Sequence, residues 1–166
     1  MKTLVVYYSL TGRTKLVSQV IAETLNATMA EITEIRPRKP GGLTYLTGSF
    51  AALTNRGSKI RPVDVDLKQI DTILIGSPIW ASRPTPAVNS FIYRTNFEGR
   101  NIIPFFTLGG ENLDKALANI KLKIERRQGR VVGSFAVTTH EVSGEEIMAR
   151  AKEAAESLRS HIIRAG

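Results

Sequence analysis

The chain has 166 residues, a formal net charge of +8 at pH 7 and no cysteine. A single domain of this length can build a stable hydrophobic core without disulfides or bound metals. The lack of cysteine excludes disulfides, thiolate metal sites and a cysteine nucleophile, and it fits a reducing cytoplasm. Apolar runs stay below the roughly 18 residues of a membrane span, and basic residues do not interleave with aromatics as in nucleic-acid-binding proteins.

Five β-rich runs follow one another along the chain, at residues 3–8, 28–35, 72–75, 102–108 and 131–137. The second run is the weakest of the five. The first and the fourth are almost continuously apolar, which is typical of strands buried on both faces of a parallel sheet. We therefore expect these runs to form the sheet of the protein.

Helical periodicity fills each interval between the runs. The first helix is expected to end near Asn26, and a second, shorter one to cover the apolar positions of 43–53. A third begins with Pro86 at its first position, a fourth follows the cap Asn112, and the last begins with a capping box at Ser143. Strand and helix therefore alternate along the whole chain.

This alternation predicts an α/β fold in which helices cover both faces of a parallel sheet, giving three layers. Right-handed crossovers leave few topologies, and five strands favour the order 2-1-3-4-5. Ligands then bind at the carboxyl ends of the strands, where the winding direction reverses. No repeat or linker interrupts the chain, so we expect residues 1–166 to form a single domain.

The loop after the first run has the pattern of a phosphate site and consists of Ser9, Leu10, Thr11, Gly12, Arg13 and Thr14. Unpaired backbone N–H groups and the dipole of the following helix attract an anion there. Three hydroxyls add donors, and Gly12 lets the main chain come close to the ligand. The alternative is a helix whose hydroxyls cap only its own first turn. We expect Arg13 to contribute its backbone N–H.

A second loop is predicted from Gly76 to Pro86, with the candidate residues Ser77, Pro78, Ile79, Trp80 and Ala81. Trp80 is the only tryptophan and lies between two groups of prolines, so its indole is expected to stack on a planar ring. The alternative is an indole that folds back over the core.

The loops after the last two strands give weaker signals. Gly109 and Gly110 would let the main chain approach a flat ring, although a plain tight turn would look the same. His140 and Glu141 are adjacent, but neighbours in a loop rarely face each other. We therefore expect no catalytic side chain, and with two histidines and no cysteine no metal site.

These loops resemble those of the flavodoxin family. Residues 9–14 are similar to the loop that holds the FMN phosphate, and residues 76–80 resemble a segment that lies against the isoalloxazine in short-chain members. The resemblance implies a flavodoxin-like fold, one non-covalent FMN and electron transfer. The chain departs from the family in being basic, in having no aromatic residue at 109–112, and in having Ala81 in place of a glycine.

The leading hypothesis is a cytoplasmic flavodoxin that carries electrons to or from a redox partner protein with an acidic docking face. An FMN-dependent NAD(P)H:quinone-type oxidoreductase is the alternative, since an open flavin face and a basic surface would suit an anionic nucleotide. A flavin-free module that binds other proteins is the third hypothesis. We expect a monomer or homodimer, with neither nucleic acid nor membrane as partner.

Overall fold

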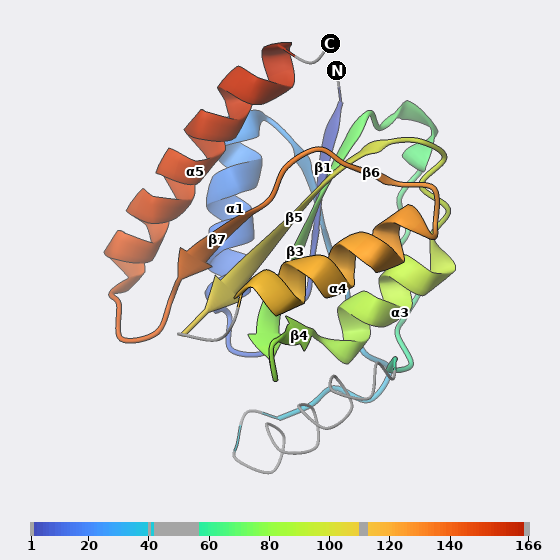
Figure 1. Ribbon diagram of the computed structural model, residues 1–166. Coiled ribbons are helices and arrows are strands. Elements are labelled where there is room, and N and C mark those ends of the chain that lie inside the picture. The colour runs from blue at the N-terminus through green and yellow to red at the C-terminus, as the bar shows by residue number, and fades with distance from the viewer. Residues whose placement is uncertain (1, 40, 42–56, 110–112, 165–166) are drawn as a thin grey trace.

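The computed structural model describes residues 2–39, 41, 57–109 and 113–164 (Figure 1). The strands are β1 (Thr3–Tyr7), β2 (Thr28–Glu31), β3 (Thr72–Trp80), β4 (Arg83–Pro84), β5 (Asn101–Leu108), β6 (Arg130–Val131) and β7 (Phe135–Thr138). The helices are α1 (Arg13–Leu25), α3 (Pro86–Arg94), α4 (Leu113–Glu125) and α5 (Gly144–Arg164), and a 3-10 turn, η1 (Leu67–Gln69), precedes β3. The helix predicted at 43–53 lies outside the described residues.

The sheet is the middle of three layers, with α1 and α5 on one face and α3 and α4 on the other (Figure 1). Its parallel strands run in the order β2-β1-β3-β5-β6, and β7 pairs with β5 further along the same edge. The predicted α/β class is therefore confirmed, and the parallel strands follow the expected order 2-1-3-4-5. The described sheet has seven strands and not five, because β4 pairs with β3 and the predicted fifth strand is divided into β6 and β7. None of the described helices has both the length and the apolar character needed to cross a bilayer.

The fifth strand, predicted as one piece, is broken in two. β6 pairs with the start of β5 at Asn101 and Ile102, and β7 pairs with its end, from Phe105 to Leu108. Residues 132–134 lie between the two pieces and outside the ladder. Gly133 and Ser134 have low strand propensity, which explains why the pairing lapses there.

Two apolar clusters hold the layers together, one on each face of the sheet. Along β1, Leu4 and Val6 pack into the cluster under α3 and α4, whereas Val5 packs into the cluster under α1 and α5. All three side chains are fully buried. The continuous apolar run in the sequence therefore has the expected cause, because successive side chains of a strand point to opposite faces and here both faces are covered.

Gly76 is fixed by the packing of β3 against β5. A Cβ at this position would lie 2.3 Å from Cζ of Phe105, whose buried ring stacks on Phe135 with centroids 5.2 Å apart. Gly76→Ala is expected to lower the free energy of unfolding by about 1–3 kcal/mol, because the ring has no room to move. Urea denaturation tests this, with Gly133→Ala as the control, since a Cβ there meets nothing within 4 Å. Equal losses in the two variants would contradict the packing argument.

Candidate functional site

The loops predicted to bind a ligand meet at the carboxyl edge of the sheet. The chain leaves β1 toward β2 on one side and later returns to β3 on the other, so the winding direction reverses between β1 and β3. The ends of the two strands are joined there, since the backbone N–H of Tyr8 donates to the carbonyl of Gly76 at 3.1 Å. Folds of this kind bind ligands at this edge.

The turn between β1 and α1 leaves the first turn of the helix without a cap. Gly12 occupies the N-cap position with a left-handed φ of 87°, and no side chain among the described residues caps the first turn, which also contains no acidic residue. A Cβ on Gly12 would meet nothing within 4 Å, so the space beside the turn is open. Since the first N–H groups of a helix have no partner inside it, this turn can hold an anion.

The side chains of the turn divide into two groups. Ser9 and Thr11 stand at the open side, where the Ser9 hydroxyl accepts a hydrogen bond from the Gly12 N–H at 3.1 Å. Thr14 is only 2% exposed, and its Oγ1 lies 2.8 Å from Oγ1 of Thr107 in β5. The Thr14 hydroxyl thus ties α1 to the sheet, so the hydroxyls of Ser9 and Thr11 are the better placed for a ligand.

Arg13 turns its guanidinium away from the open side of the turn. Its Nη1 donates to the carbonyl of Thr139, which follows β7, at 2.6 Å. The side chain therefore links α1 to the last strand. The role predicted for the backbone N–H of Arg13 stays a prediction.

The loop predicted from Gly76 to Pro86 is wrong, because β3 continues to Trp80. β3 pairs with β5 as far as Pro78 and Thr107, and then forms a hairpin in which Trp80 faces Arg83 of β4. Prolines are typical of loops, but here Pro78 lies in β3 opposite Thr107, and Pro84 lies in β4 opposite Ile79. The indole therefore belongs to a strand and not to an open loop.

Trp80 is buried, with 5% of its surface exposed. The ring of Tyr8 meets it edge-on, with centroids 6.1 Å apart and an interplanar angle of 89°. The guanidinium of Arg38 lies 5.8 Å from the centroid of the indole. In this structure the indole is thus covered rather than offered to solvent, and its stacking on a ligand stays a prediction.

A buried carboxylate holds these covering groups in place. Glu34, whose side chain is 4% exposed, accepts hydrogen bonds from the Tyr8 hydroxyl at 3.1 Å and from Nε of Arg38 at 3.2 Å. We call Tyr8, Glu34, Arg38 and Trp80 the indole cluster. Glu34 and Arg38 were not predicted as site residues, since the sequence shows Arg38 only as part of a basic, proline-containing stretch.

The remaining residues of the hairpin differ in what they can offer. Ser77 is fully buried, and its Oγ accepts from the backbone N–H of Thr85 at 3.0 Å, so its hydroxyl braces the hairpin. Ile79 is 3% exposed and belongs to the core. Pro78 is half-buried and Ala81 is exposed at the tip, so these two can reach a ligand.

The loop after β5 lies against the loop after β7. A Cβ on Gly109 would come within 3.0 Å of Cβ of His140, and Gly110 lies outside the described residues. The expectation that His140 and Glu141 do not face each other is wrong, since Nδ1 and Oε1 are 3.8 Å apart. Both side chains are well exposed, 61% and 87%, so this is a surface contact.

Comparison with known proteins agrees with this arrangement. The sequence model of the flavodoxin family matches residues 2–143. The chain belongs to the flavodoxin family. No curated protein matches it.

Solved structures similar to this flavodoxin-family chain come from several bacteria and from Archaea. A flavoprotein of Lactobacillus acidophilus NCFM in complex with FMN is 22% identical, with a TM-score of 0.72, over 81% of this chain and 92% of that one. A protein of Bacteroides uniformis ATCC 8492 classed as a flavoprotein is 25% identical, with a TM-score of 0.75, over 89% and 96%. A flavodoxin from Archaea is 19% identical, with a TM-score of 0.55, over 96% and 99%.

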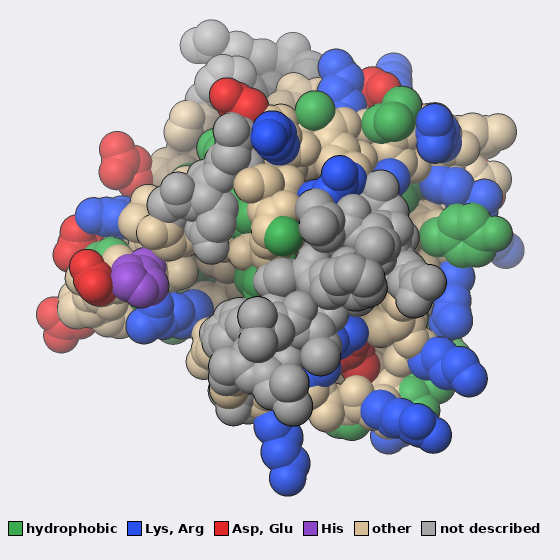
Figure 2. Space-filling view, turned by 60° about the horizontal axis from the view of Figure 1, so that its bottom comes forward, with side chains coloured by type: hydrophobic (Ala, Val, Ile, Leu, Met, Phe, Trp, Pro, Cys, Tyr) green, Lys and Arg blue, Asp and Glu red, His purple; other side chains and the backbone are tan. Residues whose placement is uncertain are grey.

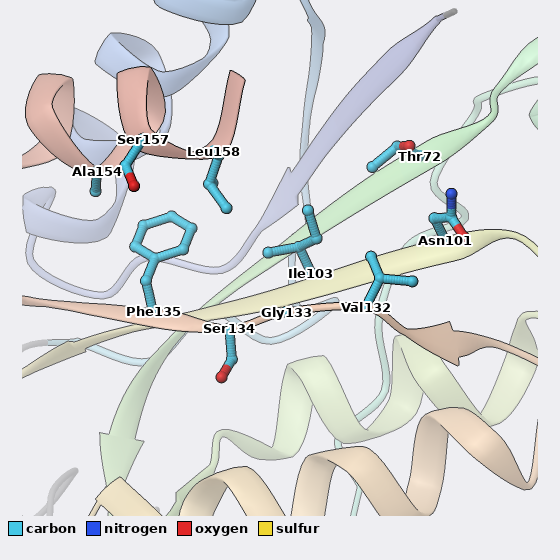
Figure 3. Close-up of a pocket in the computed structure, with 10 residues that line it drawn as sticks. All are labelled: Thr72, Asn101, Ile103, Val132, Gly133, Ser134, Phe135, Ala154, Ser157 and Leu158. Carbon is cyan, nitrogen blue, oxygen red and sulfur yellow. The ribbon is translucent and has the colours of Figure 1, made fainter. Parts of the chain in front are cut away.

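A separate cavity of about 300 Å³ lies at the opposite edge of the sheet (Figure 3). Phe135 and Leu158 point toward each other across one end of it, and Thr72 and Asn101 stand at the other. The unpaired residues between β6 and β7, 132–134, line this cavity together with residues of β3, β5 and α5. Members of this fold class bind ligands at the carboxyl edge, so this cavity is not the candidate site.

The tip of the hairpin is strained in this flavodoxin-family protein. Ala81 and Ser82 both have left-handed conformations, with φ of 48° and 57°, as a two-residue turn of the mirror-image type requires. Left-handed backbone costs a non-glycine residue roughly 1–2 kcal/mol. Ala81→Gly is therefore expected to raise the free energy of unfolding by about 1 kcal/mol. Chemical denaturation measures it, and a variant less stable than the parent would contradict the turn.

Two tyrosines at this edge, Tyr7 and Tyr8, make the free energy of unfolding depend on pH in the alkaline range. Burial raises the pKa of Tyr8, and the charge of Glu34 raises it further, while burial and then Glu31 raise the pKa of Tyr7. Above pH about 10 the unfolded chain loses these protons before the folded one does, so stability is complete below that pH and falls above it. Unfolding free energies measured between pH 8 and 11 test this, and Tyr8→Phe should flatten the fall. A parent and a variant with identical pH profiles would contradict it.

Proposed function

We propose that this protein binds one FMN at the carboxyl edge of its sheet and carries electrons between protein partners in the cytoplasm. The observation that carries the proposal is the uncapped start of α1, where the space beside the left-handed Gly12 is open and an anion would fit. FMN supplies the redox chemistry, and the protein supplies binding, orientation and exclusion of water. The FMN bound by the Lactobacillus acidophilus protein, which shares the fold, supports the choice of cofactor.

The residues of the turn fit the phosphate of FMN. The hydroxyls of Ser9 and Thr11 and the backbone N–H groups from Gly12 to Thr14 would surround the phosphate oxygens. A phosphate oxygen would take over the Gly12 N–H that now donates to Ser9. Phosphate binding here needs no lysine ammonium or arginine guanidinium, because charge-assisted hydrogen bonds from several donors and the helix dipole stabilise the phosphate dianion.

The flavin ring would lie beside the β3–β4 hairpin and the loop after β5. Pro78 and Ala81 present surface there, and Gly109 brings main chain to the same edge. Direct stacking on the indole of Trp80 would require Arg38 to leave the ring, which the buried Glu34 opposes. The phosphate turn, and not the indole, is therefore the part of the site that is ready for the ligand.

The positive net charge favours a second candidate function as well. With a charge of +8, the protein would attract either an acidic redox partner or an anionic NAD(P)H. An FMN-dependent NAD(P)H:quinone-type oxidoreductase is therefore the second candidate.

One experiment separates these functions. The purified protein, reconstituted with FMN, is mixed with NADPH without oxygen while the flavin absorption is followed. An electron carrier keeps its oxidised flavin for minutes and is bleached only by dithionite. Rapid bleaching by NADPH would instead make the protein a reductase, and a protein that takes up no FMN would be a flavin-free module.

A further inference from the structure

A basic groove runs between α3 and α4, on the face of the sheet opposite α1 and α5. It encloses about 570 Å³, and we call it the α3–α4 groove; the lining residues used below are Asn89, Tyr93, Arg94, Lys123, Arg126 and Arg127. Figure 2 shows that Lys and Arg side chains dominate the side of the molecule on which these helices end. A volume of this size is in the range of small-molecule sites.

The groove concentrates positive charge without a carboxylate among its described lining residues. Of the carboxylates nearby in the sequence, Glu125 pairs with Lys121 at 3.9 Å and Glu98 with Arg100 at 3.0 Å. These acidic groups are thus engaged with other cations. The groove is therefore suited to an anion from outside the chain.

Two of the groove's three arginines, Arg94 and Arg127, are oriented by backbone carbonyls. Arg94 donates from Nη1 to the carbonyl of Ile60 at 3.2 Å, and Arg127 donates from Nε to that of Thr95 at 3.0 Å. Each of these bonds uses one of the five N–H donors of a guanidinium. The side chains are thus positioned while their charge is not neutralised, which suits recognition of phosphate.

Lys123 and Asn89 form the inner wall of the groove. Nζ of Lys123 donates to Oδ1 of Asn89 at 2.7 Å, and burial together with the charge of Arg83 lowers the pKa of Lys123 to about 8. Nδ2 of Asn89 is buried and has no hydrogen-bond partner among the residues that the structure describes. An anion in the groove would stabilise the charged form of this lysine.

Tyr93 adds a flat apolar surface to the rim. Its side chain is 76% exposed, and the guanidinium of Arg127 lies 5.8 Å from the centre of its ring. A ligand with phosphates on the cations would bring an attached planar group against this ring, and bases stack readily on aromatic side chains.

We propose that the α3–α4 groove binds a small phosphorylated ligand of nucleotide size. Its phosphates would contact Lys123, Arg126 and Arg127, and its planar base would stack on Tyr93. The site is separate from the phosphate turn of α1, since it is built from α3 and α4 and from the residues that follow α4.

Calorimetry on the FMN-loaded protein tests this with ADP, pyrophosphate and adenosine as probes at low salt. We expect ADP to bind more tightly than pyrophosphate and adenosine to bind weakest, since only ADP uses both the cations and Tyr93. Arg126→Gln/Arg127→Gln should weaken ADP binding at least tenfold. The control Lys152→Gln/Arg159→Gln removes the same charge from exposed positions of α5 and should weaken it less than twofold.

Tyr93→Ala keeps the groove testable even if the double arginine variant does not fold, because this exposed ring contributes little to the core. It should weaken ADP binding several-fold and leave pyrophosphate binding unchanged. No binding of ADP at millimolar concentration, or equal weakening in the groove and α5 variants, would overturn the proposal. Each variant should still bind FMN, which would show that a change in ADP binding does not come from damage to the FMN site.

Discussion

Thr11→Asp is expected to weaken FMN binding about 100-fold, because it places a carboxylate beside the open start of α1, where the phosphate would bind. The variant removes one charge-assisted hydrogen bond, worth roughly 1.5–3 kcal/mol, and adds repulsion between like charges. Thr11 is exposed, so the core is not disturbed. A carboxylate at a helix start should even stabilise the helix slightly. Titration of the apoprotein with FMN, followed by flavin fluorescence, measures the effect.

Thr11→Asn is the matched control, since it has nearly the same shape as the aspartate but no charge. It keeps a side chain able to donate a hydrogen bond and should cost less than about tenfold in affinity. Equal affinities of the two variants would mean that no phosphate binds at this turn. Greater stability of Thr11→Asp in the absence of flavin would exclude unfolding as the reason for its weaker binding.

Arg38→Gln is expected to lower the free energy of unfolding by about 2–3 kcal/mol, because it leaves the buried carboxylate of Glu34 without its cation. The value is below that for a fully buried pair, since the side chain of Arg38 is 21% exposed. Glu34→Gln in the same chain should recover most of the loss, because two neutral amides replace the ion pair. Urea denaturation of the single and double variants measures this coupling.

Arg36→Gln removes the same charge two residues away, from an exposed side chain, and should change stability by less than about 0.5 kcal/mol. Since Trp80 is the only tryptophan and Arg38 lies over it, its fluorescence also reports on the indole cluster. The emission should shift to longer wavelength in Arg38→Gln and not in Arg36→Gln. Identical spectra and stabilities in the two variants would show that the cluster has no energetic role.

The open turn before α1 could be predicted as a candidate site because its determinants are local. Gly12 and the hydroxyls on either side of it stand in one short segment, directly between an apolar strand and a helix. The roles of single side chains could not be predicted in the same way. The Thr14 hydroxyl bonds to Thr107, and Arg13 bonds to the carbonyl of Thr139, and both partners are distant in the sequence.

The residues that surround Trp80 could not be predicted from the sequence, for a similar reason. Its neighbours Tyr8 and Arg38 come from segments that are brought together only when β1, β2 and β3 form the sheet. From the sequence, Glu34 would be expected at the surface. In the structure it is buried, and its carboxylate accepts hydrogen bonds from two side chains, those of Tyr8 and Arg38. The order of the strands was easier to predict from the sequence, because uninterrupted apolar runs and alternating helices restrict a parallel sheet to few arrangements.

The most direct test compares FMN with riboflavin, which has the same ring system and no phosphate. Both are titrated into the unmodified apoprotein at the same ionic strength, and quenching of flavin fluorescence gives the two dissociation constants. A phosphate held by the start of α1 predicts that FMN binds about 100-fold more tightly or better, and that inorganic phosphate competes with FMN. Equal affinities for the two flavins would contradict it.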